Sequence, residues 1–223
     1  MPHVNAEGIT ELLRPFVVHN PGQLAATSTY LDLLLKWNAK INLTAVRVPE
    51  VMIARHFGES FFAANKLLSA NQAISVIDLG SGAGFPGLPL AIFAPEARVT
   101  LIEAHGKKAA FLNEVISALK LTNARVVRQR GESYSACADL VTMRAVEAFS
   151  RSLPVAMNLA KAGGRLGLMI GTSQVTAAKA ATAGVVWGDA VSFPGSESRI
   201  LLVGTKSVTV GKKSGPALES EAG

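Results

Sequence analysis

Residues 74–87 read ISVIDLGSGAGFPG and carry the strongest structural signal in the chain. The apolar, β-branched run over 74–79 predicts a buried strand, and glycines follow it at positions 80, 82 and 84. Glycine lets a backbone turn sharply and approach a ligand, and Pro86 suits the first turn of a helix. A strand, a glycine-rich turn and a helix in this order are typical of the ligand-binding edge of a parallel α/β sheet.

Six further β-branched runs follow, separated by stretches with helical spacing. They are ARVTLIEA (97–104), ARVVRQR (124–130), DLVTMR (139–144), GRLGLMIG (164–171), GVVWGDAVS (184–192) and SRILLVGT (198–205). The helices expected between the strands cover residues 86–93, 107–119, 150–160 and 173–181. This alternation predicts an α/β fold with a mainly parallel, doubly wound, seven-stranded sheet. The last two strands have only a short connection, so we expect them to form an antiparallel hairpin.

The first seventy residues show helical spacing instead. Apolar side chains recur three, four or seven positions apart at Ile9, Leu12, Leu13, Phe16, Leu24, Leu31, Leu34, Leu35 and Ile41. A further helix is expected to begin at Pro49. We therefore expect a helical extension over 1–70 packed on a core domain over 71–206, followed by a disordered tail over 207–223.

Composition excludes several classes of protein. With 223 residues and 49% hydrophobic side chains the chain can build a continuous core, and its apolar runs fall short of the roughly 18 residues that cross a bilayer. Cys137 is the only cysteine, which fits a reducing, cytoplasmic location, and no secretory signal is apparent. The four histidines are too scattered for a metal site. A net charge of +6 allows a polyanionic partner.

The expected ligand contains a ribose. Glu103 ends the second strand about 20 residues after the glycines, where a carboxylate accepts hydrogen bonds from ribose hydroxyls. NAD and S-adenosylmethionine both have such a ribose. Asp78, at the end of the first strand, suits the positive charges of S-adenosylmethionine and would repel a pyrophosphate. Phe85 also stands where a dinucleotide fingerprint has its third glycine, so we favour the methyl donor and keep an NAD-dependent oxidoreductase as an alternative.

The blocks VIDLGSGAG, TLIEA, RGES and DLVTMRA resemble the Rossmann-like class I S-adenosylmethionine-dependent methyltransferases. The blocks KWNAKINLTAVR, ARHFGES and FPGLPLAI narrow the resemblance to the RsmG (GidB) family of bacterial ribosomal RNA methyltransferases, which modify N7 of a guanine in 16S rRNA. The match covers about residues 30 to 205. It implies S-adenosylmethionine as cofactor, S-adenosylhomocysteine as product, and 16S rRNA or the small ribosomal subunit as partner. We expect a monomer, with no DNA or membrane partner.

The resemblance also implies roles for individual residues. The donor would contact Asp78, Gly80, Gly82, Gly84, Phe85, Glu103, Ala104, His105, Gly131, Glu132 and Arg144. Arg144 would in addition orient the target base as the catalytic residue. The residues that would face RNA are Asn42, Arg47, Arg55, His56 and Arg199. Asn42 and Thr44 could instead cap a helix end and a turn, and His56 could be a core histidine.

One position departs from the family. Many members have a lysine before the glycine that ends the fifth strand, where this chain has Ile170. RNA contacts would then fall to other residues, such as Lys161, Arg165 or Lys179. Methylation of guanine N7 removes no proton from the nucleophile, so no general base is expected. A noncatalytic rRNA-binding or ribosome-assembly protein with the same fold is the second alternative.

Overall fold

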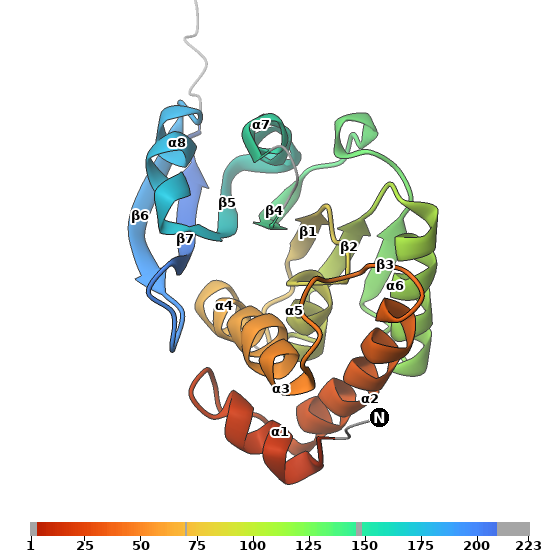
Figure 1. The fold of residues 1–223 in the computed structure, drawn as a ribbon. Coiled ribbons are helices and arrows are strands. Elements are labelled where there is room, and N and C mark those ends of the chain that lie inside the picture. Colours follow the sequence, from red (N-terminus) through yellow and green to blue (C-terminus); the bar gives the residue numbers. More distant parts are fainter. Residues whose placement is uncertain (1–3, 70, 146–148, 209–223) are drawn as a thin grey trace, which may run out of the picture.

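The computed structural model describes residues 4–69, 71–145 and 149–208, and contains one seven-stranded sheet (Figure 1). Its strands are β1 (Ser75–Leu79), β2 (Arg98–Ile102), β3 (Ala124–Val127), β4 (Ala138–Arg144), β5 (Ala160–Gly171), β6 (Val185–Ser192) and β7 (Arg199–Lys206). All seven predicted strands are confirmed. β5 begins four residues before the expected position 164, because Ala160 already pairs with Ala138 across an irregularity in β4.

The sheet order is β3-β2-β1-β4-β5-β7-β6, as in a doubly wound fold with a final reversal. β1 pairs in parallel with β2 and β4, and β2 pairs in parallel with β3. β7 lies between β5 and β6 and is antiparallel to both, which confirms the predicted hairpin. The carboxyl ends of β1 to β5 therefore meet at one edge of the sheet, called here the carboxyl edge.

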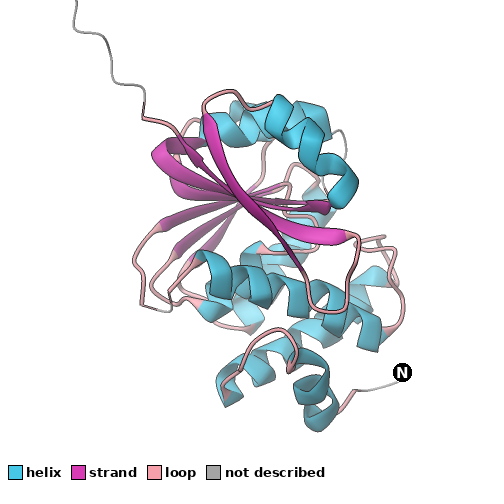
Figure 2. Ribbon diagram, turned by 90° about the vertical axis from the view of Figure 1, so that its left-hand side faces the viewer, coloured by secondary structure: helices cyan, strands magenta, loops and turns pink. Residues whose placement is uncertain are grey.

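Helices cover both faces of the sheet (Figure 2). They are α1 (Ala6–Leu13), α2 (Pro21–Asn38), α3 (Pro49–Met52), the π-helix η1 (Ile53–Gly58), α4 (Glu59–Leu67), α5 (Gly87–Phe93), α6 (Gly106–Ala118), α7 (Phe149–Leu159), α8 (Val175–Ala180) and the 3-10 turns η2 (Gly131–Ser133) and η3 (Thr172–Gln174). The expected helix over 173–181 is shorter than predicted, because its first turn is the 3-10 turn η3. No helix among the described residues is long and apolar enough to span a membrane.

Two apolar cores lie on opposite faces of the sheet. Successive side chains of β1 alternate between them, with Val76 in the first and Ile77 in the second. The first core joins the sheet to α5, α6 and the N-terminal helices, and the second joins it to α7 and α8. The helices of the N-terminal part thus share a core with the sheet. The expected tail lies outside the described residues from position 209 on.

Helix α2 illustrates how the sequence specifies the N-terminal layer. Asn20 and Gln23 form a reciprocal capping box at its start, with Pro21 at the first helical position. Its buried side chains include Tyr30 and Leu34, one turn apart. The face that carries Tyr30 packs toward the glycine-rich turn after β1, so the N-terminal layer reaches the carboxyl edge.

Candidate active site

The register of the parallel strands brings the predicted site residues together. Leu79, the last residue of β1, pairs with Ile102 of β2 and with Met143 of β4. The residues that follow these positions therefore leave the sheet side by side. The glycine loop (residues 80–84), Glu103 and Arg144 all lie at this edge, as the sequence predicted.

The glycine loop has an open side and a packed side. Gly80, Gly82 and Gly84 all have positive φ angles, of 70°, 55° and 89°. A Cβ placed on Gly82 would meet nothing closer than the Gly80 carbonyl at 3.8 Å, whereas one on Gly84 would lie 2.3 Å from the Tyr30 hydroxyl. A ligand can therefore approach the backbone at Gly82, while Gly84 allows the loop to rest on the N-terminal layer.

Glu103 connects the glycine loop to β2. Its side chain is buried, and its two carboxylate oxygens accept hydrogen bonds from the backbone N–H groups of Gly82 (2.9 Å) and His105 (2.7 Å). A carboxylate has about four acceptor positions, so Glu103 can still accept from the two hydroxyls of a ribose. Ala104 and His105 are exposed beside it, where the sequence interpretation places the adenosine end of the donor.

Asp78 lies beneath the glycine loop. Its Oδ1 accepts a hydrogen bond from the Thr142 hydroxyl (2.8 Å), and its Oδ2 has no hydrogen-bond partner among the described residues. A Cβ on Gly87 would lie 2.7 Å from that Oδ2, so the carboxylate faces the start of α5 and not the open side of Gly82. Complete burial raises the pKa of Asp78 to about 6.

A cavity lies beside the loop that follows β3. It has a volume of about 280 Å³ and lies between η2 and α7, lined by Gly131, Glu132, Tyr134 and Val155 among others. Gly131 is buried. Its backbone packs so closely on Leu79 that an added Cβ would lie 2.4 Å from a Leu79 methyl group. These are the positions at which the sequence interpretation places the adenine.

Arg144 ends β4 and is bound to the π-helical turn η1. One terminal nitrogen donates to the Arg55 carbonyl (2.7 Å) and to Glu59 Oε2 (3.0 Å), and the other to the His56 carbonyl and the Ser60 hydroxyl, both at 3.4 Å. Burial lowers the pKa of Arg144 to about 10, so the guanidinium stays charged at neutral pH. A π-helical turn has irregular carbonyl geometry, and such turns are frequent at functional sites.

Glu59 completes this cluster and is one of two residues that the sequence interpretation missed. Its side chain is only 2% exposed, and its two oxygens bind Arg144 (3.0 Å) and Arg199 Nε (2.7 Å). A single buried carboxylate therefore joins β4, α4 and β7. Glu59 follows His56 by three residues, so its helical spacing in the block ARHFGES was the available signal.

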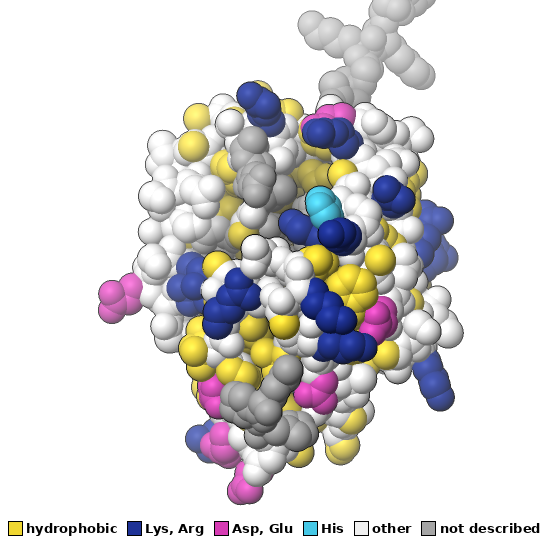
Figure 3. All heavy atoms as spheres, turned by 45° about the vertical axis from the view of Figure 1, so that its right-hand side comes forward, with side chains coloured by type: hydrophobic (Ala, Val, Ile, Leu, Met, Phe, Trp, Pro, Cys, Tyr) yellow, Lys and Arg dark blue, Asp and Glu magenta, His cyan; other side chains and the backbone are white. Residues whose placement is uncertain are grey.

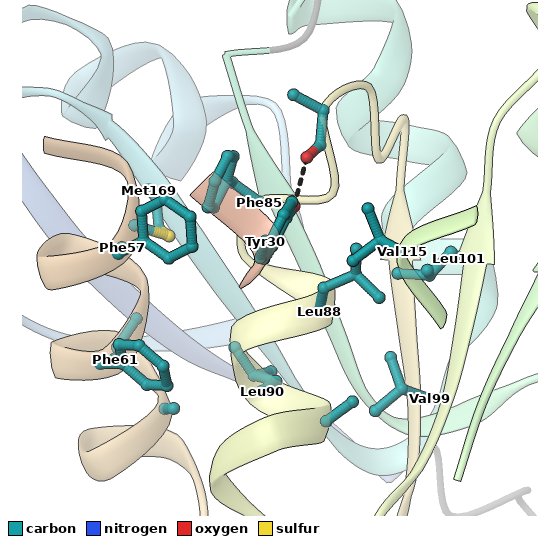
Figure 4. Packing of buried hydrophobic residues seen from close by; sticks show 14 of the residues in the cluster. Tyr30, Phe57, Phe61, Phe85, Leu88, Leu90, Val99, Leu101, Val115 and Met169 are labelled. Carbon is teal, nitrogen blue, oxygen red and sulfur yellow. Dashed lines mark hydrogen bonds between the residues drawn. The ribbon is translucent and has the colours of Figure 1, made fainter. Parts of the chain in front are cut away.

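Three rings stack against the glycine loop. Phe85 is nearly parallel to Tyr30, with centroids 5.2 Å apart and planes inclined by 8°. The His56 ring also stacks on Phe85, with centroids 5.1 Å apart and planes inclined by 30°. Figure 4 shows Tyr30 beside Phe85, with the Tyr30 hydroxyl directed at the backbone of the loop. That hydroxyl donates a hydrogen bond to the Ala83 carbonyl. Tyr30, which is fully buried, is a second residue that the sequence interpretation missed.

His56 is neutral in this environment. Burial, together with the positive charges of Arg144 and Arg55, lowers the pKa of His56 to about 3. Its Nε2 lies 2.8 Å from the Thr44 hydroxyl, and its Nδ1 is buried with no hydrogen-bond partner among the described residues. His56 is thus a partly buried, uncharged side chain at the edge of the site, with one nitrogen left unpaired.

The loop after α2 carries the remaining predicted RNA residues. Arg47 donates to Asn42 Oδ1 (2.8 Å) and to the Asn38 carbonyl (3.1 Å). Asn38, and not Asn42, binds the turn, because its Oδ1 accepts from the backbone N–H groups of Leu43 and Thr44. Arg47 and Asn42 are exposed, as is the Arg55 side chain. The capping alternative for Asn42 is therefore wrong.

Ile170 and two of its expected substitutes lie away from this surface. Ile170 is 5% exposed and belongs to the second core, where it pairs with Ile200. Lys161 binds Asp139 (2.8 Å), and Arg165 donates to the Leu67 carbonyl (2.7 Å), at the amino end of the strands. β5 places Lys161 and Arg165 at the edge of the sheet opposite to the candidate site, and their expected contact with RNA stays a prediction. Lys179 is exposed on α8.

Comparison with known proteins agrees with this geometry. The family model described as rRNA small subunit methyltransferase G matches residues 23–191. The chain belongs to the rRNA small subunit methyltransferase G family. Proteins with this name from Chloroflexus aggregans and Xanthomonas campestris pv. campestris are both 40% identical to it, over 198 and 178 residues. The matches cover 82% and 78% of this chain and 82% of each relative.

Solved structures support the fold of this methyltransferase G family member. A ribosomal protein L11 methylase from Lactobacillus delbrueckii subsp. bulgaricus matches with a TM-score of 0.59 at 12% identity, covering 69% of this chain and 79% of that one. An S-adenosylmethionine-dependent methyltransferase from Aquifex aeolicus matches with a TM-score of 0.57 at 16% identity, covering 74% and 97%. The fold is therefore the class I methyltransferase fold that the sequence predicted.

Proposed function

We propose that this protein transfers the methyl group of S-adenosylmethionine to N7 of a guanine in 16S rRNA. One observation carries the proposal: in a chain of this methyltransferase family, a buried carboxylate, Glu103, is bonded to Gly82 at the open side of a glycine loop. That arrangement offers acceptors for ribose hydroxyls beside a backbone that a ligand can approach. The dinucleotide alternative loses its support, since the family is one of methyltransferases.

The residues at the carboxyl edge fit the donor. Glu103 would accept from the ribose, while Gly131 and Glu132 would flank the adenine beside the 280 Å³ cavity. The backbone of Gly80 and Gly82 would face the methionine part, and it is open at Gly82. Asp78 would act from beneath the loop, because its carboxylate does not share that open side. When bound, S-adenosylmethionine supplies an electrophilic methyl group.

Catalysis then needs orientation and charge, and no base. Guanine N7 has a lone pair in the plane of the ring, so no proton leaves the nucleophile during the transfer. Glu59 carries one negative charge against the two guanidinium groups of Arg144 and Arg199, which leaves a net positive charge beside the loop. Such a charge can attract the RNA backbone or the O6 side of a guanine.

We assign Arg144 a positioning role in this reaction. Its guanidinium binds the Arg55 and His56 carbonyls and thereby fixes the π-helical turn beside the glycine loop. Arg55, His56, Arg199, Asn42 and Arg47 then form the side of the site expected to meet RNA. A holding role of this kind places reacting groups within the short distances that accelerate methyl transfer.

The remaining expectations extend the proposal. Residues 1–70 act as a helical extension on the catalytic core of residues 71–206, because α2 and α4 close the site from one side. The substrate is 16S rRNA or the small ribosomal subunit, and the protein works as a monomer in the bacterial cytoplasm, where that substrate is found.

The first experiment is a methyl-transfer assay. The protein is incubated with methyl-labelled S-adenosylmethionine and small ribosomal subunits that lack the modification, and nucleosides are analysed by mass spectrometry. Labelled 7-methylguanosine is the expected product. Binding of the donor without transfer to these subunits or to naked 16S rRNA would favour the noncatalytic assembly protein, and no donor binding would refute the methyltransferase.

A pair of arginine variants tests the role of Arg144. Arg144→Ala is expected to reduce kcat by at least about tenfold, since the π-helical turn loses the group that holds it. Arg165→Ala is the matched control, because Arg165 also donates to a backbone carbonyl but does so at the opposite edge. Equal turnover in the two variants would contradict the positioning role.

A further inference from the structure

A group of basic side chains flanks the candidate site and has no assigned role. Lys107 and Lys108 lie in the first turn of α6, and Arg128 and Arg130 follow β3. A Cβ on Gly106 would be 2.9 Å from the Arg128 guanidinium, so this guanidinium lies directly over the start of α6. The four residues therefore form one surface, called here the basic flank. Figure 3 shows Lys and Arg side chains gathered around a histidine on one face of the molecule.

The cations of the basic flank are unpaired. Within residues 4–69, 71–145 and 149–208, none of the four makes an ion pair or a side-chain hydrogen bond. The nearest acids along the chain are Glu103, whose carboxylate is occupied by two backbone N–H groups, and the exposed Glu132. The basic flank thus carries four positive charges, and Glu132 is the one exposed carboxylate among these nearest acids.

Three cations at the amino edge of the sheet are bound instead by the protein itself. Lys161 binds Asp139, and Arg165 donates to the Leu67 carbonyl. Lys206 donates to the carbonyls of Met157 and Ala160 at the end of α7. These three side chains satisfy acceptors of the protein, whereas those of the basic flank remain available to a partner.

The position of the flank indicates which partner it meets. His105 lies between the flank and Glu103, and its N–H binds the same carboxylate that accepts from Gly82. A polymer whose target base enters the site would therefore continue across the flank. Unpaired Lys and Arg side chains on such a path suit a chain of phosphates.

We propose that Lys107, Lys108, Arg128 and Arg130 bind the phosphate backbone of rRNA beside the nucleotide that enters the active site. This inference rests on the proposed function, because the polymer is taken to be the RNA substrate. The contacts are with phosphates and carry no sequence information, so they set affinity and the register of the RNA on the enzyme. The target nucleotide is selected by the residues of the active site and not by the basic flank.

Two charge-matched variants test this. The first replaces the flank with glutamine: K107Q, K108Q, R128Q and R130Q. The control carries R14Q, K66Q, R98Q and K120Q. These four exposed residues lie at the start of β2 and at or just beyond the C-terminal ends of helices. Both variants lose the same net charge, so any difference between them reports the location of the charge.

The measurement is binding of an unmodified 16S rRNA transcript at several potassium chloride concentrations. Each lost phosphate contact lowers the slope of log affinity against log salt by about 0.7 to 0.9. The flank variant is expected to bind at least about tenfold more weakly near 0.15 M salt, with a slope reduced by about 3 to 3.5 if all four contacts are lost. The control is expected to stay within about twofold of the wild type.

Donor affinity and turnover separate this proposal from its premise. The flank variant is expected to bind S-adenosylmethionine like the wild type and to show a raised KM for RNA with an unchanged kcat. Equal RNA binding by the flank and control variants would overturn the proposal. So would a loss confined to intact small subunits, because that result assigns the flank to a ribosomal protein. A wild-type protein that binds RNA through the flank and transfers no methyl group would overturn the proposed function alone.

Discussion

The hydrogen bond between Tyr30 and the glycine loop offers the sharpest test of how the N-terminal layer contributes to donor binding. In Tyr30→Phe the ring that stacks on Phe85 is retained, and only the hydroxyl that donates to the Ala83 carbonyl is lost. The bond is buried. Its loss leaves a buried acceptor without this donor, which costs about 1–3 kcal/mol.

The effect on the donor follows from the position of that acceptor. Ala83 lies between Gly82 and Gly84, so the hydroxyl holds the loop in the shape that leaves Gly82 open. If about 1.4 kcal/mol of that stabilisation is lost from the binding conformation, the apparent Kd for S-adenosylmethionine rises about tenfold. The assay is isothermal titration calorimetry with S-adenosylhomocysteine or the donor, beside urea denaturation of the same protein.

Thr27→Val is the matched control on the same helix. The buried Thr27 hydroxyl donates to the Gln23 carbonyl within α2 and does not contact the glycine loop, so its loss should leave donor affinity within about twofold. A Tyr30→Phe variant that is less stable and yet binds the donor as tightly as the wild type would refute the reasoning. The hydroxyl would then support the core without shaping the loop.

Three further results are expected. Gly84→Ala should abolish donor binding and destabilise the fold, because its Cβ would be 2.3 Å from the Tyr30 hydroxyl. Gly184→Ala is the control, since Gly184 has a similar φ but nothing within 4 Å of its Cβ position, and it should lower the free energy of unfolding by only about 1–2 kcal/mol. Thermal denaturation compares the two variants. Glu59→Gln should lower the free energy of unfolding by about 3–5 kcal/mol, measured in urea, because it removes the carboxylate that the two guanidinium groups share. The pKa of His56 is about 3 in the folded protein and an ordinary 6.5 in the unfolded chain. Between these pH values the unfolded chain binds a proton at His56 and the folded protein does not. His56 should therefore contribute a loss of stability of up to about 1.4 kcal/mol per pH unit as the pH drops below 6.5, while the raised pKa of Asp78 contributes in the opposite direction. His56→Gln should lose the His56 contribution when its denaturation curves at pH 7.5 and 5.5 are compared with those of the wild type.

The site shows which parts of a sequence interpretation are secure. Gly82 and Glu103 were predicted together and lie together, because each follows directly after a strand and parallel register aligns the strand ends. A contact of Asp78 with the donor stays a prediction, and the structure adds that its carboxylate lies beneath the loop, toward α5. Position along the chain determined which edge a residue reaches, and the pleat determined on which side of the loop it lies.

Local patterns in the sequence were sufficient for the strands, the helices, the final hairpin and the glycine loop. Such features depend on residues that are near one another in the chain, as with the β-branched runs and the capping box of Asn20 and Gln23. The family was also evident from short blocks, which the comparisons confirm.

Only the tertiary structure decided how the N-terminal helices take part in the site. Tyr30 reaches the Ala83 carbonyl across 53 residues, and Glu59 reaches Arg199 across 140. Helical spacing could have indicated Glu59 as a site residue, but neither its partner nor that of Tyr30 follows from the sequence, because each pairing depends on how a helix packs against the finished sheet. The sequence by itself thus determined the donor-binding edge, and long-range packing of buried polar groups determined which side chains hold that edge in shape.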